Sequence, residues 1–113
     1  MIVVIGEQKT KRKAMISQPM AGLTEQEIEA TRALATDWLK KDGFEVIDTY
    51  FTDNDPIFET EEQKRNPVFL LAKSIEAMSK VDSVYFCKGW EKSRGCQVEH
   101  LVAEKYGLCM YYM

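Results

Sequence analysis

A glutamate near the start of a predicted helix is the residue of this sequence best placed to do chemistry. The run KGWEKSRGCQVEH (88–100) carries Ser93, Arg94 and Gly95 shortly before Glu99. The free N–H groups and the positive dipole end of a helix starting there favour an ionised carboxylate and an anionic ligand such as a phosphate. An ionised carboxylate beside a sugar is a candidate nucleophile. Favourable helix electrostatics alone are the usual explanation for a glutamate near a helix N-terminus.

A second unusual loop, SQPMAG (17–22), follows the first predicted strand. In open parallel sheets, ligands bind beyond the carboxyl ends of the strands, where successive connections leave toward opposite faces. We expect that point between the first and third strands, which places this loop beside KGWEKSRGC (88–96). The candidate binding residues of the two loops are Ser17, Gln18, Pro19, Gly22, Gly89, Trp90, Ser93, Arg94 and Gly95.

Several of these residues also have an ordinary structural explanation. Trp90 either stacks on a base or ribose, or covers the edge of the sheet as a hydrophobic plug. Ser93 caps the helix, binds a phosphate, or does both. Gly22 and Gly95 allow a positive φ. These alternatives stay open at the level of sequence.

The cysteines and the histidine show no metal-binding or disulfide pattern. Cys87, Cys96 and Cys109 lack CxxC spacing, so we expect reduced thiols, no metal and no cofactor. A helix N-terminus lowers the pKa of a thiol, but no general base accompanies Cys96, so Glu99 is the better nucleophile candidate. His100 points about 100° away from Glu99 around the helix and is expected at the surface or in an interface.

The order of the predicted elements indicates how the two loops meet. Short runs of β-forming residues alternate with segments of helical period, which is the pattern of βαβ units around a parallel sheet. Four strands, in the spatial order 2-1-3-4, are predicted at 13–17, 44–48, 82–87 and 108–112.

Capping residues predict where the three helices begin and end. Thr24 and Glu27 form a capping box, and Gly43 follows the end of that helix. Asn66 and Pro67 begin the second helix, and the third runs from about Gly95 to Tyr106. The helical residues expected to face the core are Ile28, Ala35, Trp38, Leu39, Leu71, Ile75, Met78, Val98, Leu101 and Val102.

Two segments fit this scheme less well. Residues 1–12 contain the run IVVIG (2–6), predicted to be an edge strand or an arm that reaches a partner, while 13–113 form the domain. The stretch 49–65 is long for a connection and carries five acidic residues. We expect a lid, a dimer element or a solvated acidic loop.

Composition restricts the class of protein. The 113 residues, of which 45% are apolar, are enough for one domain with an ordinary core. A net charge of −3 argues against binding to a nucleic-acid polymer, which normally requires a basic face, but not against binding of a nucleotide monomer. No apolar run approaches about 20 residues, and the first residues do not read as a signal peptide. We therefore expect a soluble cytoplasmic protein that does not enter membranes.

Two long stretches together resemble the nucleoside 2-deoxyribosyltransferase-like superfamily, in particular a small bacterial and phage subgroup with a GWExSxGxxxE signature. They are MISQPMAGLTEQEIEATRALATDWLKKDGFEVID and SIEAMSKVDSVYFCKGWEKSRGCQVEHLVAEKYGL, so the similarity runs from Lys13 to near the end of the chain. The signature falls on Gly89, Trp90, Glu91, Ser93, Gly95 and Glu99.

This resemblance implies a flavodoxin-like three-layer α/β domain that forms a homodimer or a higher oligomer, with sites completed near the subunit interface. It also implies cleavage or exchange of the N-glycosidic bond of a (deoxy)nucleoside or its 5′-monophosphate. In this comparison the nucleophile is Glu99 and the phosphate-binding serine of the hydrolase branch is Ser93.

The sequence departs from the family pattern at two positions. The aspartate that those enzymes carry before the third strand is replaced by Ser74, and the tyrosine of the first strand has no counterpart in Lys13, Ala14 or Met15. The proton donor to the leaving base is then Glu91, a residue of the acidic loop, or water. Besides the enzyme, two further hypotheses remain: a module that binds a nucleotide or an ADP-ribose-like signal without chemistry, and an oligomeric scaffold.

Overall fold

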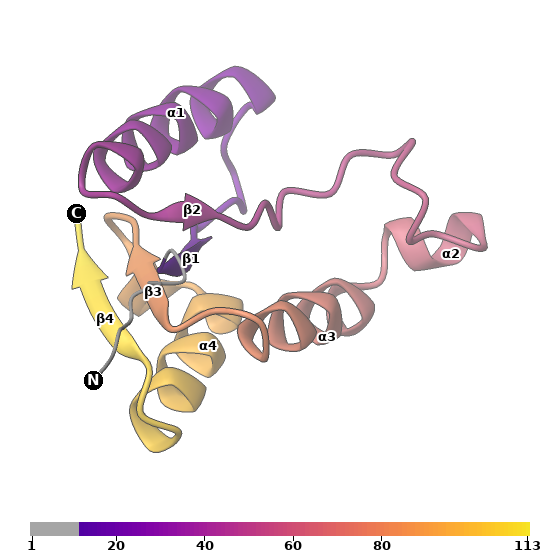
Figure 1. Ribbon diagram of the computed structural model, residues 1–113. Coiled ribbons are helices and arrows are strands. Elements are labelled where there is room, and N and C mark those ends of the chain that lie inside the picture. Colours follow the sequence, from indigo (N-terminus) through magenta and orange to yellow (C-terminus); the bar gives the residue numbers. More distant parts are fainter. Residues whose placement is uncertain (1–11) are drawn as a thin grey trace, which may run out of the picture.

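Four parallel strands form one sheet between helices in the computed structural model, which describes residues 12–113 (Figure 1). The spatial order is β2-β1-β3-β4, as predicted, and the fold is of the flavodoxin-like α/β class. The strands are β1 (Lys13–Ser17), β2 (Glu45–Val46), β3 (Ser83–Phe86) and β4 (Cys109–Tyr112). The helices are α1 (Glu25–Lys41), α2 (Glu61–Lys64), α3 (Pro67–Met78), η2 (Trp90–Lys92) and α4 (Arg94–Lys105). The strand predicted at 2–6 lies outside the described residues.

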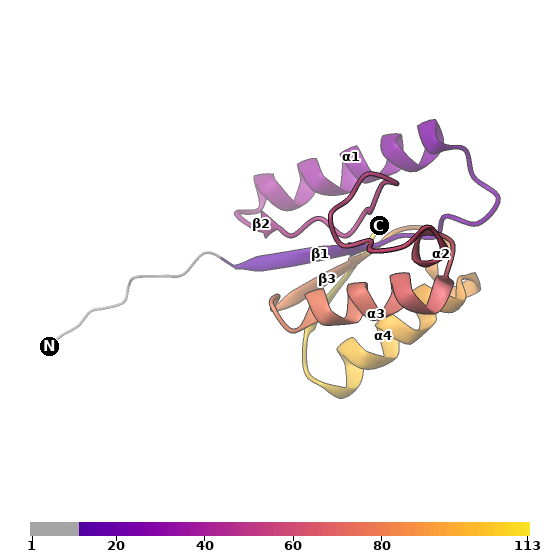
Figure 2. The ribbon, with the colours of Figure 1, turned by 90° about the vertical axis from the view of Figure 1, so that its right-hand side faces the viewer.

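Helices cover both faces of the sheet: α1 lies on one face, and α3 and α4 lie on the other (Figure 2). Ala14 and Ile16 of β1 belong to the core cluster on the side of α1, whereas Met15 belongs to the cluster on the side of α3 and α4. Because successive side chains of a strand point to opposite faces, Ser17 faces the layer of α3 and α4. This alternation decides which helix Ser17 can contact.

The predicted helix starts are present. Both hydrogen bonds of the capping box between Thr24 and Glu27 form, at 2.9 and 3.1 Å. The Asn66 side chain accepts from two backbone N–H groups of α3, and Pro67 is the first residue of that helix. These caps use donors that have no partner within the helix.

The inward face of α4 differs from the prediction. Val98 is 37% exposed and Leu101 is 52% exposed, so the expectation that both face the core is wrong. The buried residues of α4 are Cys96, Glu99 and Ala103. Their spacing is that of one helix face, but the middle residue carries a carboxylate. Apolar periodicity therefore does not predict that this face is the buried one. Glu99 thus occupies a core position.

The other helices and β2 show smaller differences. Ile28, Ala35 and Leu39 of α1 are buried as predicted. Trp38 is 44% exposed, and its ring is tilted against that of Tyr85 at 5.3 Å between ring centroids. In α3 only Met78 is buried. Strand β2 has two residues rather than the five predicted at 44–48.

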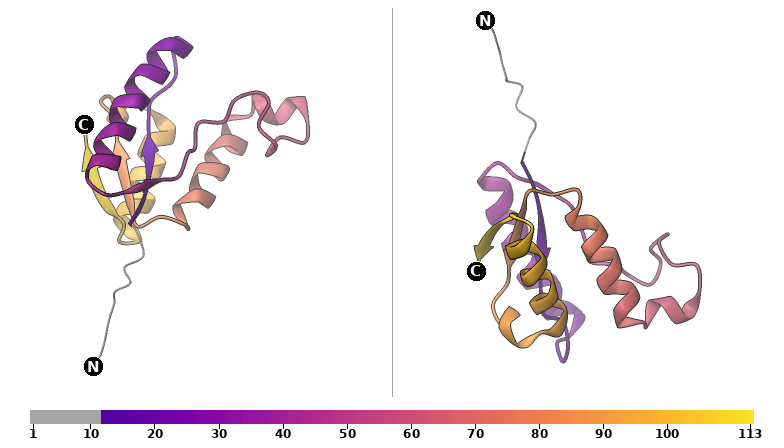
Figure 3. Two further views of the ribbon diagram at one scale, coloured as in Figure 1. Left: turned by 45° about the horizontal axis from the view of Figure 1, so that its top comes forward. Right: turned by 90° about the horizontal axis from the view of Figure 1, so that it is seen from below.

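The segment between β2 and α3 stands out from the body of the molecule together with α2 and the first part of α3 (Figure 3). We call residues 49–66 the acidic arm. The arm contains α2, a helix that the sequence pattern did not predict, and the Phe58 ring lies 5.8 Å from that of Phe69 in α3. Within residues 12–113, none of the helices has both the length and the hydrophobicity needed to cross a bilayer.

Candidate functional site

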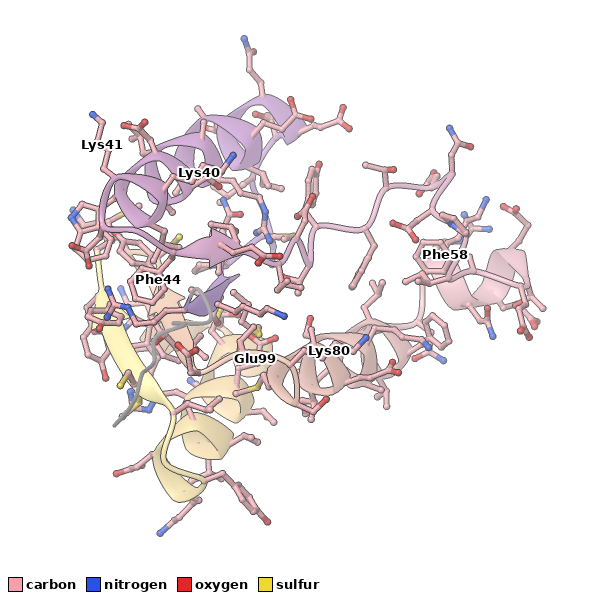
Figure 4. The ribbon with its side chains drawn as sticks, viewed as in Figure 1. Lys40, Lys41, Phe44, Phe58, Lys80 and Glu99 are labelled. Atoms are coloured by element: carbon pink, nitrogen blue, oxygen red, sulfur yellow. The ribbon has the colours of Figure 1, made fainter. Side chains whose placement is uncertain are left out.

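The candidate site is centred on the carboxylate of Glu99, which Figure 4 shows where α3 and α4 meet the sheet. The side chain is 7% exposed, and its Oε1 accepts a hydrogen bond of 2.5 Å from the Oγ of Ser17 at the end of β1. The hydroxyl of Ser74 in α3 also lowers the pKa of this carboxyl. Three elements distant in sequence therefore meet at one buried acidic group.

Burial and hydrogen bonding act on the Glu99 carboxyl in opposite directions. Removal from water raises its pKa above the ordinary value, and this is the largest effect. The hydroxyls of Ser17 and Ser74 and the positive charge of Arg32 lower the pKa and so favour the ionised form. The ionised state of Glu99 depends on these three partners.

Ser74 lies in α3, the helix before β3, as the sequence comparison implied. At the level of sequence it was recognised only as the replacement for an expected aspartate. In the structure its hydroxyl lowers the pKa of Glu99, whereas an ionised aspartate there would repel the neighbouring carboxylate and raise that pKa. Ser74 thus supports the charge on Glu99.

The two loops predicted to form the site are in contact. Gly89 has φ +90°, and a Cβ on it would lie 3.6 Å from Cγ of Pro19 in the other loop. The N–H of Cys87 donates to the carbonyl of Ser17 at 2.9 Å. Gly22 has φ +79° in an exposed turn with open space around it. The expected juxtaposition of 17–22 and 88–96 is therefore present.

The N-terminal residues of α4 have definite local roles. The Oγ of Ser93 accepts from the N–H of Cys96 at 3.4 Å, so Ser93 is the N-cap. Arg94 is exposed. Gly95 lies inside the helix, and its φ is not positive, so the expectation of a positive φ there is wrong. The helix end itself remains available to an anion.

Trp90 is part of an aromatic stack. Its indole lies 4.1 Å from the imidazole of His100 at an interplanar angle of 11° and 5.4 Å from the Phe86 ring. Nε2 of His100 lies 2.7 Å from the hydroxyl of Tyr112. The indole face against His100 is covered, which favours the plug interpretation for that face of the ring.

Gln18 and Arg32 form a buried polar network on the side of the sheet that α1 covers. Gln18 donates from Nε2 to the carbonyl of Ile28 at 2.8 Å and accepts at Oε1 from Nη1 of Arg32 at 3.0 Å. Nη2 of Arg32 donates to the Oγ1 of Thr49 at 3.0 Å, and its Nε lies 3.4 Å from Oδ1 of Asp48. The Gln18 amide is thus engaged within the protein.

Arg32 and Thr49 were not identified from the sequence. Arg32 is 8% exposed and Thr49 is 7% exposed. A signal for Arg32 was present, since it lies between Ile28 and Ala35 on the apolar stripe of α1, where a charged residue is unusual unless paired. Thr49 carries no comparable signal because it lies in the irregular connection after β2.

The cysteines near the site are poor nucleophiles. Burial raises the pKa of Cys87 to about 11, and burial also raises the pKa of Cys96. Both thiols therefore stay protonated at neutral pH. Among residues 12–113, no three His, Cys, Asp or Glu side chains gather in a way that could hold a metal ion.

Two surface hollows lie away from Glu99. One is between α1 and β2 and is lined by Glu29, Arg32, Ala33, Thr36, Asp37, Lys40, Val46 and Asp48. The other lies on the acidic arm, between Asp53 and Lys64. Glu99 lines neither of them.

Comparison with known proteins gave one match. The family model described as "Domain of unknown function (DUF4406)" matches residues 12–112. The searches of curated proteins and of solved structures returned no match.

Proposed function

Since this chain belongs to the DUF4406 family, which carries no activity in its description, we propose a function from its site: a nucleotide-binding N-glycosidase or deoxyribosyltransferase-like protein with Glu99 as nucleophile. Its substrate is a (deoxy)nucleoside or the corresponding 5′-monophosphate. The observation that carries the proposal is the buried Glu99 carboxylate, which accepts a 2.5 Å hydrogen bond from Ser17. The resemblance of residues 13–113 to the nucleoside 2-deoxyribosyltransferase-like superfamily supports the choice of substrate.

The place of Glu99 in the fold supports this proposal. The connections after β1 and β3 leave toward opposite faces, which is where ligands bind in open α/β sheets. The N-terminus of α4 lies beside the same strand ends and provides free N–H groups and a positive dipole end for a phosphate. Ser93 is the capping residue at this end, and Arg94 next to it is a surface charge.

In the proposed reaction, an oxygen of Glu99 attacks C1′ of the sugar. The bond between C1′ and the base nitrogen breaks, its electron pair leaves with the base, and the base takes a proton from water, the acidic arm or Glu91, which is exposed. Water, or a second base, then attacks C1′ of the glycosyl ester and releases the carboxylate. A carboxylate nucleophile divides one difficult displacement into two easier ones, as in retaining glycosidases.

Release of free base from deoxynucleoside 5′-monophosphates, followed by chromatography, tests the proposal. Glu99→Gln is expected to abolish release while changing ligand affinity by less than about tenfold, or about 1.4 kcal/mol. Glu104→Gln is the matched control, since Glu104 is exposed on the same helix. Unchanged turnover in Glu99→Gln would exclude Glu99 as the nucleophile.

A second candidate function is a module that binds a nucleotide or an ADP-ribose-like signal without cleaving it. Ser74 favours this hypothesis because a serine cannot provide the carboxylate that the related enzymes carry at that position. Thermal shifts measured with the same ligands separate the two functions. A ligand-dependent shift without base release indicates a binder, and release indicates an enzyme.

We also propose that the chain forms a homodimer or a higher homo-oligomer. Helix α3 (PVFLLAKSIEAM) is strongly apolar, yet only Met78 is buried and Val68 is 73% exposed. The acidic arm beside it carries Asp53, Asp55, Glu59, Glu61 and Glu62, and exposed lysines at 40, 41 and 80 offer complementary charge on a second copy. Sedimentation is expected to show an oligomer that Val68→Asp dissociates; a monomeric wild type would exclude it.

A further inference from the structure

The strand that carries Ser17 is held from the side opposite Glu99 by a single buried arginine. Thr49 Oγ1 accepts from Nη2 of Arg32 at 3.0 Å and lies 3.3 Å from the carbonyl of Ile16, to which it donates. Gln18 accepts from Nη1 of the same guanidinium at 3.0 Å. Arg32 therefore fixes residues 16 and 18, which flank Ser17 in the chain.

On the β3 side, backbone pairing supports Ser17, whose carbonyl accepts from the N–H of Cys87 at 2.9 Å. On the β2 side, backbone pairing stops short of this point. Strand β2 is two residues long, and the N–H of Ile47 donates to the carbonyl of Ala14 at 2.8 Å. Two residues further along β1, the carbonyl of Ile16 is bonded by the Thr49 hydroxyl instead of a strand. Since an unpaired buried carbonyl is costly, the Thr49 side chain replaces the missing ladder bond, and Arg32 holds Thr49 in place.

The guanidinium suits this role because its planar fork presents donors in fixed directions. Three of its nitrogens face three different partners, namely Gln18, Thr49 and, at 3.4 Å, Asp48. An ammonium group on a flexible stem cannot hold the same three partners at once. Burial lowers the pKa of Arg32, and Asp48, Cys87 and Glu99 oppose that effect through their charges.

We propose that Arg32 is a positioning residue for Glu99: it fixes the end of β1 through Gln18 and Thr49, and thereby holds the Ser17 hydroxyl in hydrogen-bonding position on the carboxylate. The consequence for catalysis rests on the proposed function, whereas the consequence for the ionisation of Glu99 does not. The positive charge of Arg32 also lowers the pKa of Glu99 directly, as the Ser17 hydrogen bond does. The experiment therefore has to separate the effect of this charge from the effect of positioning Ser17.

The groups that face Glu99 come from each surrounding element. The hydroxyls of Ser17 in β1 and Ser74 in α3 lower the pKa of Glu99, Arg32 of α1 contributes positive charge, and the neutral thiol of Cys96 lies on the same helix. Loss of the Ser17 hydrogen bond or of the Arg32 charge therefore raises the pKa of Glu99.

Carbon-13 NMR titration of the Glu99 carboxyl in the full chain, without any substrate, tests the proposal. Arg32→Met is expected to move the titration midpoint of Glu99 upward, and Ser17→Ala is expected to do the same. In the double variant the effect of Arg32→Met should shrink to less than about half of its size in the wild-type background, because both changes remove one hydrogen bond. Lys40→Met, which removes a charge from an exposed position of the same helix, is the control and should leave the midpoint unchanged.

A second variant keeps the test decisive if Arg32→Met does not fold. Thr49→Val retains the charge of Arg32 and the shape of the side chain but removes the hydroxyl on Ile16. It is expected to raise the midpoint of Glu99 as well. An unchanged midpoint in Thr49→Val, or an undiminished effect of Arg32→Met in the Ser17→Ala background, would overturn the proposal.

Kinetics then distinguishes this proposal from the proposed function. If the wild type releases base, Arg32→Lys is expected to lower kcat by about tenfold or more with little change in KM. If the wild type releases no base but the midpoint of Glu99 moves as described, the proposed activity fails and the role of Arg32 stands.

Discussion

The hydroxyl of Ser17 donates a hydrogen bond of 2.5 Å to the carboxylate of Glu99, which lies 82 residues further along the chain. Both side chains are buried. A carboxylate removed from water remains ionised only where donors or positive charges compensate for the lost hydration. The contact therefore joins the end of β1 to α4 and also lowers the pKa of the candidate nucleophile, against the larger effect of burial.

Ser17→Ala is expected to reduce the free energy of unfolding at pH 8 by about 1.5–3 kcal/mol, because the hydroxyl donates to a charged, buried acceptor. The reduction should become smaller as the pH falls, since protonated Glu99 needs the donor less. Urea unfolding at several pH values measures this. Ser83→Ala is the matched control: Ser83 is equally buried but donates to the exposed Asp82, and a loss of about 1 kcal/mol or less is expected.

Glu99→Gln is expected to gain stability relative to the wild type as the pH rises. Burial raises the pKa of Glu99 in the folded state above the unfolded value of about 4.3. The native state then binds the proton more tightly than the unfolded state does. The stability that this binding adds to the wild type is complete below about pH 4.3 and is lost as the pH rises through the folded pKa. The variant lacks this titration. A stability difference that stays constant from pH 4 to pH 8 would contradict the raised pKa.

Substitution of Gly89 by alanine is expected to destabilise the protein by about 1–2 kcal/mol, because φ is +90° there and a Cβ is strained in that conformation. The contact at 3.6 Å with Pro19 is an ordinary one and adds little. Gly95→Ala in α4 serves as the comparison, since its Cβ would meet nothing within 4 Å and a helix favours alanine by up to about 1 kcal/mol. Equal unfolding midpoints for the two variants would argue against the left-handed conformation at Gly89.

Thiol labelling of the native protein is expected to modify one cysteine rapidly at pH 8. Cys109 is exposed, whereas Cys87 and Cys96 are buried. With its pKa raised to about 11, Cys87 is ionised in only about one molecule in a thousand at that pH. Mass spectrometry after brief exposure to iodoacetamide measures the sites, and Cys109→Ser should remove the rapid phase. Rapid modification of Cys96 would show that the base of α4 is more open than the structure indicates.

Local patterns in the sequence predict most of the framework. The capping residues Thr24 and Asn66 mark helix starts correctly because their hydrogen bonds reach only two or three residues along the chain. The order of strands follows from alternating strand and helix segments. Glu99 was identified for the same reason, since it stands near a helix start whose cap, Ser93, is also local.

Contacts between distant segments account for what the sequence did not predict. The inward face of α4 was assigned to Val98 and Leu101 because apolar periodicity has no way to recognise a carboxylate that is buried and paired. The extent of β2 was overestimated, since Thr49 pairs with β1 through its side chain rather than its backbone. No pattern within α1 indicates that Arg32 meets Gln18 and Thr49.

The sequence by itself determined the α/β class, the strand order, the helix starts and the meeting of the two loops at the carboxyl ends of β1 and β3. Only the tertiary structure decided that Glu99 is buried, that the hydroxyls of Ser17 and Ser74 lower its pKa, and that Arg32 bonds to Gln18 and Thr49. The physical reason is range: capping and periodicity depend on neighbours within one or two turns, whereas the ionisation of a buried carboxylate depends on groups that only folding brings together.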